Sequence, residues 1–273
     1  MKFSVLMSVY KNENPEYFKL AVESVLNGTV KPDEVVLVRD GEVPPELQSV
    51  IDYYVSDNPV FTYIPLSENG GLGNALKIGT EKARCDLIAR MDTDDICVQN
   101  RFELQLKFFE EHPEVSVCGG QISEFTDSPE NPIAKRKVKL SHEDICRFLK
   151  GRCPFNHMTV MFKKQAVLDA GNYQHFPLME DYYLWCRMYL NGAIFANLDE
   201  VLVNARVGSD MYKRRGGYKY FKSGYALEKF KLKNKIIGKF EFLKRTAMRF
   251  IVQVLMPNGL RGWVLKTFCR KKV

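Results

Sequence analysis

This 273-residue sequence lacks any arrangement of cysteine or histidine that is typical of a set of metal ligands. The seven cysteines are odd in number and include no C-x-x-C pair, which argues against a disulfide framework and a cysteine-based zinc site. The four histidines form no H-E-x-x-H or H-x-H arrangement, which excludes the common histidine-rich metal sites. We therefore expect a protein of the reducing cytosol.

Long apolar runs are also missing. No stretch approaches the roughly 18 consecutive apolar residues of a membrane-spanning helix. The apolar run from Phe3 to Tyr10 ends at Lys11 and no small-residue cleavage site follows, so it does not predict a signal peptide. G-x-G-x-x-G and G-x-x-x-x-G-K-[ST] are absent too, which disfavours a nicotinamide enzyme and a P-loop kinase.

The composition is that of a globular protein, with 45% hydrophobic and 27% charged residues. The length fits one large domain or one domain with an appendage. The net charge of +7 is unevenly distributed. Residues 229–273 hold thirteen Lys or Arg and one acid, Glu241, so this tail carries +12 and residues 1–228 carry −5.

Apolar, β-branched runs alternate with helical patterns in the first half of the chain, which predicts a parallel sheet covered on both faces. Functional sites in such sheets lie beyond the carboxyl ends of the strands. The expected strands are 3–9, 34–38, 61–64, 87–91 and 115–118, and the expected helices are 15–26, 44–54, 72–83 and 101–111. The second half is less regular. We expect a loop at 127–137, helices at 141–149, 164–169 and 181–190, a strand at 159–162 and a mobile loop at 208–217.

Three carboxylates, Asp92, Asp94 and Asp95, directly follow the expected strand 87–91. Oxygen ligands of this kind suit Mg²⁺ or Mn²⁺, which would neutralise a diphosphate. The alternative is a solvated, Asp-rich turn that caps the next helix. The position after a buried strand favours the functional interpretation.

Two further polar features belong to neighbouring strand ends. Asp40 follows strand 34–38 and could accept hydrogen bonds from a nucleobase or ribose, although an Asp before a Gly is also common in turns. The glycine-rich stretch 69–74 opens a helix, where free backbone N–H groups can hold a phosphate. Its glycines could equally serve tight packing between strand and helix.

The pair Glu180 and Asp181 begins an expected helix. A carboxylate here could act as a general base on a hydroxyl, and stabilisation of the helix start is the alternative. Nucleophilic catalysis by cysteine is poorly supported, because no cysteine has a persuasive histidine partner in the sequence.

The order of these motifs resembles that of the family 2 glycosyltransferases with a GT-A fold, over about residues 3–207. The series is SVYKNE, RDG, N-x-G-x-x-x-A-x-x-x-G, DTDD and EDYYLW, accompanied by NHMTVMF and AGNY. The stretch GSDMYKRRGG is similar to a bacterial subgroup that builds O-antigen, capsule or amylovoran-type exopolysaccharide. The resemblance implies a Rossmann-like, mostly parallel sheet flanked by helices, and an inverting transfer of a sugar from a nucleotide.

Site roles follow from the resemblance. It implies a donor site for a UDP-sugar, a metal site for Mn²⁺ or Mg²⁺, and a general base with an orienting partner. The implied donor contacts are Val9, Tyr10, Glu13, Asp40, Asn69, Lys77, Asp92 and Thr93. Asp94 would bind the metal with Asp95 as a rival ligand, and Asp181 would be the base with Glu180 beside it. Acceptor or diphosphate contacts would come from His157, Arg206, Arg214 and Arg215.

Two of these assignments have open alternatives. His157 could instead fill the core beside Phe155, and the basic loop could simply be solvated. One motif also departs from the family, because many relatives have A-R-N where this chain has Ala75-Leu76-Lys77. A donor contact made by that arginine is either missing here or moved to Lys77.

The expected organisation is a catalytic domain over 1–212, divided into a nucleotide-sugar half (1–120) and an acceptor half (121–212), followed by a basic loop and an amphipathic C-terminal extension over 213–273. The basic tail fits an anionic membrane surface, although an ordinary helix with a solvated basic face is the alternative. Nucleic acid is not expected, because no nucleic-acid module is visible and the body is acidic.

The predicted function is transfer of a hexose, galactose or glucose first, from a UDP-sugar to a hydroxyl of an undecaprenyl-diphosphate-linked saccharide. We expect a peripheral enzyme on the cytoplasmic face of the cell membrane. A metal-dependent nucleotidyltransferase and a non-catalytic nucleotide-sugar or membrane-docking protein are the alternatives.

Overall fold

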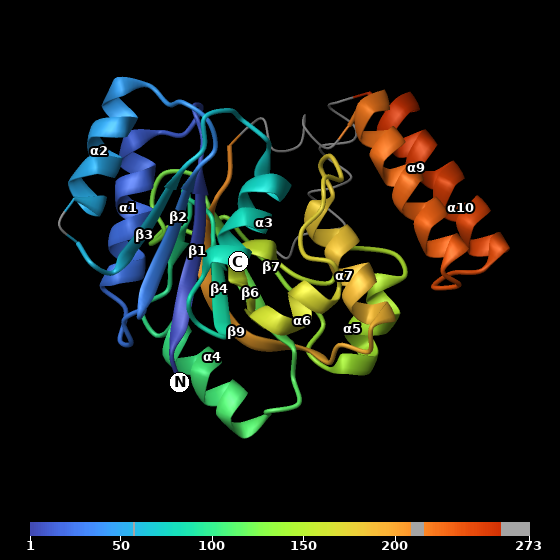
Figure 1. Cartoon of the computed structure of the whole chain (residues 1–273). Helices are drawn as coiled ribbons and strands as arrows, with labels where there is room; N and C mark the ends of the chain where they lie inside the picture. Colours follow the sequence, from blue (N-terminus) through green and yellow to red (C-terminus); the bar gives the residue numbers. More distant parts are fainter. Residues whose placement is uncertain (57, 209–215, 258–273) are drawn as a thin grey trace.

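The computed structural model describes residues 1–56, 58–208 and 216–257, and a nine-stranded sheet lies at the centre of these residues (Figure 1). The strands run in the order β3-β2-β1-β4-β8-β6-β9-β5, and β7 pairs with β6 outside this order. Helices cover both faces of the sheet, which confirms the predicted α/β class.

The first four strands are parallel and pair side by side. They are β1 (Phe3–Val9), β2 (Glu34–Arg39), β3 (Phe61–Pro65) and β4 (Leu87–Met91). β1 lies between β2 and β4 and is covered on both faces, which explains its nearly continuous apolar sequence. The parallel direction brings the carboxyl ends of these strands to one edge of the sheet.

Four helices alternate with these strands, and the apolar face of each points to the sheet. They are α1 (Pro15–Leu26), α2 (Pro45–Val55), α3 (Leu72–Lys82) and α4 (Arg101–Glu111). α1 begins because Asn14 accepts hydrogen bonds from the N–H groups of Glu16 and Tyr17, with Pro15 in the first helical position. α1, α2 and α4 share one buried cluster, whereas α3 packs on the opposite face.

α3 lies unusually close to β1. A Cβ atom at Gly79 would lie 2.2 Å from the Leu6 Cδ1 atom and 3.1 Å from the Val38 Cγ2 atom, so a larger residue here would displace buried side chains of β1 and β2. The close contact sets the distance of α3 from these strands.

The other half of the sheet is mixed. Its strands are β5 (Ile96–Cys97), β6 (Val117–Phe125), β7 (Ala134–Arg136), β8 (Met161–Lys163) and β9 (Phe195–Arg206). β8 pairs antiparallel with both β4 and β6, and β6 pairs parallel with β9. This half is the least regular part of the sheet, because the β6–β9 register shifts near Gln121.

Several expectations for this half were wrong in detail. The strand expected at 115–118 begins at Val117 and continues to Phe125, and the strand expected at 159–162 is a 3₁₀ turn, His157–Thr159, followed by β8. The loop expected at 127–137 contains β7. β5 and β9 had not been predicted at all.

Three further helices pack on the same face as α3. They are α5 (His142–Leu149), α6 (Lys164–Asp169) and α7 (Glu180–Leu190). The Ser141 hydroxyl accepts the N–H of Asp144 and starts α5, as the sequence predicts. Trp185 of α7 is fully buried and packs edge-on against Phe155, which fixes α7 on the sheet.

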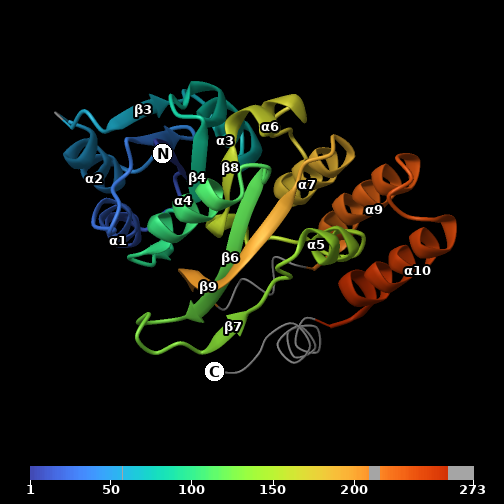
Figure 2. The same ribbon diagram turned by 90° about the horizontal axis from the view of Figure 1, so that it is seen from below.

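The described chain ends in a helical hairpin. α9 (Tyr218–Lys233) packs on α7 through contacts such as the edge-on pair of Phe230 and Tyr183. α10 (Lys239–Phe250) packs on the other side of α9 and runs into a π-helical turn, Ile251–Leu255. Figures 1 and 2 both place α10 farthest from the sheet. Among the described helices, none has the length and apolar content needed to span a membrane.

Candidate active site

Four acidic side chains gather where β1 and β4 end, and we call Glu13, Asp92, Asp94, Asp95 and the neighbouring Arg90 the edge cluster. Carboxylate oxygens of Asp92, Asp94 and Asp95 all lie within 4.8 Å of one another. This proximity follows from the sequence, because the three residues form a tight turn directly after the buried strand β4.

Burial and mutual repulsion shift the acidities of this cluster. Burial, together with the charges of Asp92 and Glu13, raises the pKa of Asp94 to about 7. Burial, together with the charges of Asp92 and Asp94, raises the pKa of Asp95 well above its usual range. One oxygen of Asp95, Oδ2, is buried without a hydrogen-bond partner among the described residues. The cluster is therefore short of positive charge.

Two arginines partly offset the acids. Arg90 is buried and forms an ion pair with Asp92, but its Nε and Nη1 groups have no partner among the described residues. Arg206 supports the turn through its backbone N–H, which donates to Asp95 Oδ1 at 2.7 Å, and through Nε, which donates to the Asp94 carbonyl at 3.2 Å. Its guanidinium carbon lies 3.8 Å from the ring centroid of Tyr17.

Glu13 joins the cluster from the segment after β1. Its Oε2 accepts the hydroxyl of Thr93 at 2.5 Å, and its Oε1 accepts the N–H of Asn14 at 2.9 Å. Burial raises the pKa of Glu13. Tyr10 is exposed beside it, whereas the side chain of Val9 belongs to the core, so only the backbone of Val9 reaches the edge.

Asp40 holds the glycine-rich turn that precedes α3. Its two carboxylate oxygens accept the N–H groups of Gly70 at 2.8 Å and Gly71 at 2.9 Å, and Asn69 Nδ2 donates to its carbonyl at 3.0 Å. These two amides are already occupied, which favours packing over phosphate binding as the purpose of the turn. Lys77 is exposed one helical turn further on.

The second pair of predicted acids lies in the first turn of α7. Glu180 packs against the start of α3, where a Cβ at Gly73 would lie 2.9 Å from Glu180 Cγ. Burial raises the pKa of Glu180, and its Oε1 accepts the N–H of Leu178 at 3.3 Å. Asp181 Oδ2 accepts a hydrogen bond from the thiol of Cys153, with the sulfur 3.2 Å away.

Tyr173 and His157 connect the two groups of acids. His157 Nε2 lies 2.9 Å from the Tyr173 hydroxyl, and burial together with the positive charge of Arg90 lowers the pKa of His157 well below its usual value. Burial raises the pKa of Tyr173, and both Asp181 and Asp92 add to this effect. Tyr173 therefore lies within electrostatic reach of both the edge cluster and α7.

Sequence reasoning missed three residues of this arrangement. Arg90 could have been noticed as a charge inside the buried run of β4, and Tyr173 as part of the AGNY turn. Cys153 carries no signal in the sequence, because its contact with Asp181 spans 28 residues. Arg214 and Arg215 lie outside the described residues, so their predicted contacts are not placed.

The proteins to which this chain is similar in sequence are glycosyltransferases. The model of the family described as "Glycosyl transferase family 2" matches residues 4–170. The chain is 42% identical over 268 residues to the amylovoran biosynthesis glycosyltransferase AmsE of Erwinia amylovora, covering 95% of this chain and 100% of that protein. It is 36% identical over 270 residues to the UDP-Gal:alpha-D-GlcNAc-diphosphoundecaprenol beta-1,3-galactosyltransferase of Escherichia coli, covering 99% and 97%.

Solved structures share the fold at low sequence identity. The S. aureus TarS fragment 1–349 in complex with UDP-GlcNAc is 17% identical with a TM-score of 0.68, covering 97% of this chain and 76% of that chain. The mannosyltransferase PcManGT from Pyrobaculum calidifontis, in complex with GDP-Man and Mn²⁺, is 15% identical with a TM-score of 0.62, covering 95% and 71%.

Proposed function

The chain belongs to glycosyl transferase family 2, and from this premise we propose that it transfers a hexose from a UDP-sugar to a hydroxyl of an undecaprenyl-diphosphate-linked saccharide, with inversion at the anomeric carbon. The product is a unit of a bacterial surface polysaccharide. The observation that carries the proposal is the edge cluster at the carboxyl end of β4, together with Tyr173, which lies within electrostatic reach of both Asp92 of this cluster and Asp181 of α7.

The identity of the donor is supported by the E. coli relative, whose name includes UDP-Gal and a GlcNAc-diphosphoundecaprenol acceptor. Galactose is therefore the first sugar to test, followed by glucose. Asp40 would contact the nucleobase, and Asp92 would lie near the ribose or the donor sugar. The other side-chain contacts to the donor would come from Tyr10, Glu13, Asn69, Lys77 and Thr93. The backbone of Val9 completes this side of the site.

The edge cluster fits a divalent cation. Oxygen ligands close together, raised pKa values and the unpartnered Oδ2 of Asp95 are the properties of a site that a hard cation would stabilise. Asp94 and Asp95 would hold Mn²⁺ or Mg²⁺. When bound, the ion supplies positive charge that stabilises the leaving diphosphate. Arg206 keeps the Asp94–Asp95 turn in place and presents its guanidinium at the same edge.

Asp181 acts as the general base. It removes the proton of the acceptor hydroxyl as the oxygen attacks the anomeric carbon, and the UDP leaves from the opposite face. The Cys153 thiol orients the Asp181 carboxylate through its hydrogen bond, and Glu180 lies beside it as a contact for the acceptor. Burial and the charge of Arg90 keep His157 neutral. His157 is hydrogen-bonded to the Tyr173 hydroxyl, and this pair would contact the acceptor.

The lipid-linked acceptor places the reaction at a membrane surface. The strongly basic C-terminal tail supports binding to the anionic cytoplasmic leaflet as a peripheral protein. Basic residues of the tail and of the 208–217 segment would add contacts to the acceptor diphosphate.

The test is UDP release from a panel of UDP-, GDP- and dTDP-sugars with and without Mn²⁺, followed by transfer to a lipid-linked GlcNAc acceptor. We expect metal-dependent release from one UDP-sugar, and a loss of about 10²- to 10⁴-fold in kcat for Asp181→Asn. Asp94→Ala should abolish the metal-dependent release of UDP. Asp52→Asn, an exposed carboxylate on α2, is the control and should keep full activity.

Two outcomes would contradict the proposal. Pyrophosphate released from a nucleoside triphosphate would indicate a nucleotidyltransferase instead. Metal-dependent binding of a UDP-sugar without transfer to any lipid-linked saccharide would indicate a non-catalytic binding protein. Full activity of Asp181→Asn would remove the base assignment but leave the donor site in place.

A further inference from the structure

The last described helix, α10, has its polarity reversed relative to an ordinary surface helix. A surface helix normally buries its apolar side and exposes its charges. In α10 and the turn that follows, the most exposed side chains are mainly apolar, with exposures between 40% and 78%. They are Phe240, Leu243, Met248, Phe250, Ile251 and Leu255.

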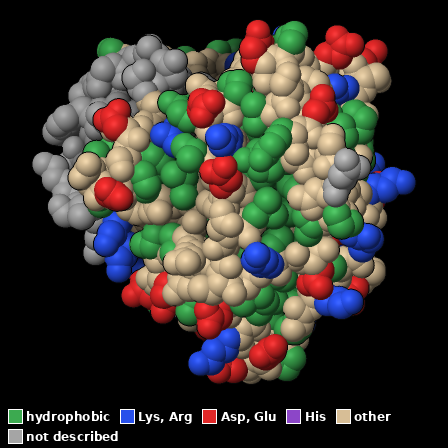
Figure 3. All heavy atoms as spheres, turned by 90° about the vertical axis from the view of Figure 1, so that its left-hand side faces the viewer, with side chains coloured by type: hydrophobic (Ala, Val, Ile, Leu, Met, Phe, Trp, Pro, Cys, Tyr) green, Lys and Arg blue, Asp and Glu red, His purple; other side chains and the backbone are tan. Residues whose placement is uncertain are grey.

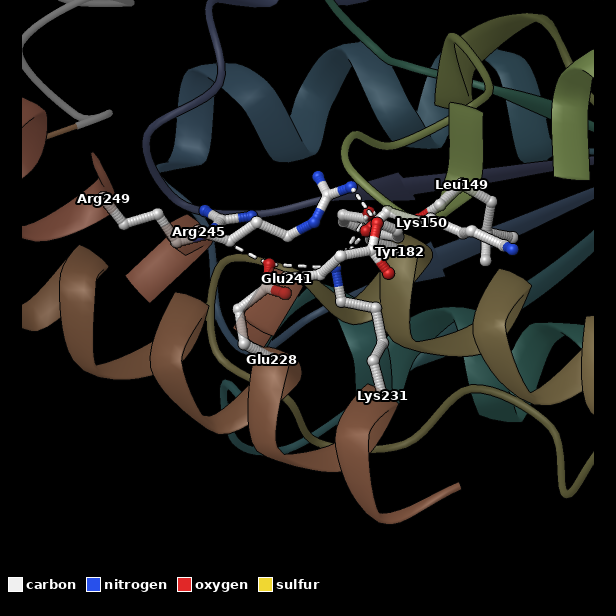
Figure 4. A network of polar contacts seen from close by, with 8 residues as sticks. All are labelled: Leu149, Lys150, Tyr182, Glu228, Lys231, Glu241, Arg245 and Arg249. Atoms are coloured by element: carbon white, nitrogen blue, oxygen red, sulfur yellow. Dashed lines mark hydrogen bonds and ion pairs between the residues drawn. The ribbon is translucent and has the colours of Figure 1, made fainter. Parts of the chain in front are cut away.

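The two arginines of α10 face the protein instead. Arg249 Nε donates to Glu228 Oε1 of α9 at 3.1 Å, and Arg245 Nη2 donates to Glu241 Oε1 at 3.3 Å (Figure 4). Arg245 also lies directly against Gly151, where a Cβ would be 2.3 Å from its Nη1 atom. The contacts of Arg249 with Glu228 and of Arg245 with Gly151 fix the rotation of α10 about its own axis, so its apolar side is held outward.

The same network ties the hairpin to the catalytic domain. We call Glu228, Lys231 and Arg249 the hairpin cluster. Lys231 Nζ donates to Glu228 Oε1 at 2.8 Å, to the Lys150 carbonyl at 3.0 Å and to the Tyr182 hydroxyl of α7 at 3.3 Å (Figure 4). α10 is therefore not a loosely attached segment, and its outward face has a defined direction relative to α7.

The hairpin that carries this apolar face is also rich in exposed positive charge. Seven lysines of the hairpin are exposed: Lys219, Lys222, Lys229, Lys233, Lys235, Lys239 and Lys244. The two described hairpin acids offer little opposing charge, since Glu228 is buried and Glu241 is paired with Arg245. Exposed apolar side chains and exposed lysines on one hairpin match a surface whose headgroups are anionic and whose interior is hydrocarbon.

We infer that α10 lies in the headgroup layer of an anionic membrane with Phe240, Leu243, Ile251 and Leu255 inserted toward the acyl chains. Attachment then depends on apolar insertion as well as on charge. The inference takes from the proposed function only the identity of the membrane, the one that carries the lipid-linked acceptor.

Two other occupants fit less well. A second copy of this hairpin would bring two lysine-rich surfaces together. The chain's own residues 258–273 hold five Lys or Arg and no acid, so they offer no charge complementary to the hairpin lysines. Phosphatidylglycerol headgroups do offer it.

The test compares Leu243→Glu with Tyr53→Glu in binding to vesicles of phosphatidylethanolamine and phosphatidylglycerol. Tyr53 is as exposed as the α10 residues but lies on α2, on a face where apolar side chains are interspersed with both charges (Figure 3). We expect Leu243→Glu to weaken binding about tenfold or more, and Tyr53→Glu to leave it unchanged. Equal binding of all three proteins would overturn the inference.

A fluorescent reporter separates insertion from surface attraction. Phe240→Trp in a Trp263→Phe background should be quenched by lipids brominated in the acyl chain, while the remaining Trp185 is fully buried in the protein. Binding that is abolished by salt and gives no quenching would show that only charge is involved. A dimer that Leu243→Glu dissociates, without any change in vesicle binding, would assign the face to a second copy.

These measurements use no sugar nucleotide. Vesicle binding with no transfer activity would therefore contradict the proposed function alone. Transfer to a short water-soluble acceptor with no vesicle binding would contradict the insertion of α10 alone.

Discussion

Two buried groups of charges in this protein are built on opposite plans. In the hairpin cluster the buried charges are of opposite sign: Lys231 has three N–H groups and three acceptors within 3.3 Å, and Arg249 pairs with the same Glu228, whose Oε2 alone has no partner among the described residues. In the edge cluster the acids outnumber the one buried arginine. Its acids repel one another, Asp95 keeps an unpartnered oxygen, and Arg90 has two N–H groups without partners among the described residues.

This difference distinguishes a cluster that stabilises the fold from a cluster that fits a ligand or an ion. A buried group of opposite charges that are hydrogen-bonded to one another holds two elements together, and removing one partner leaves the other charge buried and unpaired. A buried group of like charges destabilises the fold and is typical of sites where a ligand or ion supplies the missing charge. The two clusters should therefore respond in opposite directions when a charge is removed.

The largest effect is expected at Lys231. Lys231→Met leaves Glu228 buried beside only Arg249 and removes the contacts with Lys150 and Tyr182, so the free energy of unfolding should fall by about 3–5 kcal/mol. Urea denaturation measures this change. Lys229→Met, an exposed lysine on the same helix, is the control and should change it by about 0.5 kcal/mol or less.

A triple variant sharpens this result. Combining Lys231→Met with Glu228→Leu and Arg249→Met removes all three charges together, so much of the lost stability should return. Equal stability of Lys231→Met and Lys229→Met would show that the hairpin cluster does not hold α9 to α7.

A substitution at Asp94 should instead raise the free energy of unfolding. Because its pKa is raised from 3.8 to about 7, the folded state keeps a proton that the unfolded state loses, and the fold loses stability as the pH rises through this window. Asp94→Asn should therefore be more stable than the natural protein by about 1–3 kcal/mol at about pH 8 without divalent metal. The gain should shrink toward about pH 4, and Mn²⁺ should stabilise the natural protein more than the variant. A variant less stable at both pH values would refute the repulsion.

The smallest effect is expected at His157, next to Arg90. Burial and Arg90 lower its pKa below the usual 6.5, so the unfolded state takes up the proton first and stability is lost as the pH falls below 6.5. Relative to His157→Gln, the natural protein should lose about 1.4 kcal/mol per pH unit there. Denaturation at about pH 7.5 and about pH 5.5 tests this, with the exposed His175→Gln as control. A constant difference between the two proteins would show that His157 is not held neutral.

Sequence patterns predicted the parallel half of the sheet well. β1, β2 and β4 are apolar runs long enough to be recognised, and Asn14 and Ser141 begin helices where the sequence places a cap. β9 was missed because Asp199 and Glu200 interrupt its apolar pattern, and its hydrogen bonds come from β6, about 80 residues earlier in the chain.

The candidate site also has a part that could be predicted from the sequence and a part that could not. The carboxylates after β4 and at the start of α7 could be named from the sequence, since each follows a recognisable element. Their environment could not. The thiol beside Asp181, the tyrosine between the two acidic groups and the amides held by Asp40 all come from contacts between distant segments.

The sequence by itself determined the α/β alternation, the carboxylates at one edge of the sheet and the basic tail, because periodicity, strand ends and charge are local properties. Only the tertiary structure decided that α10 turns its arginines inward and Phe240, Leu243 and Met248 outward. A helix has two sides in its sequence, but which side faces the protein depends on the partners it meets. Here a buried Glu228 on α9 binds Arg249 and leaves the apolar side exposed.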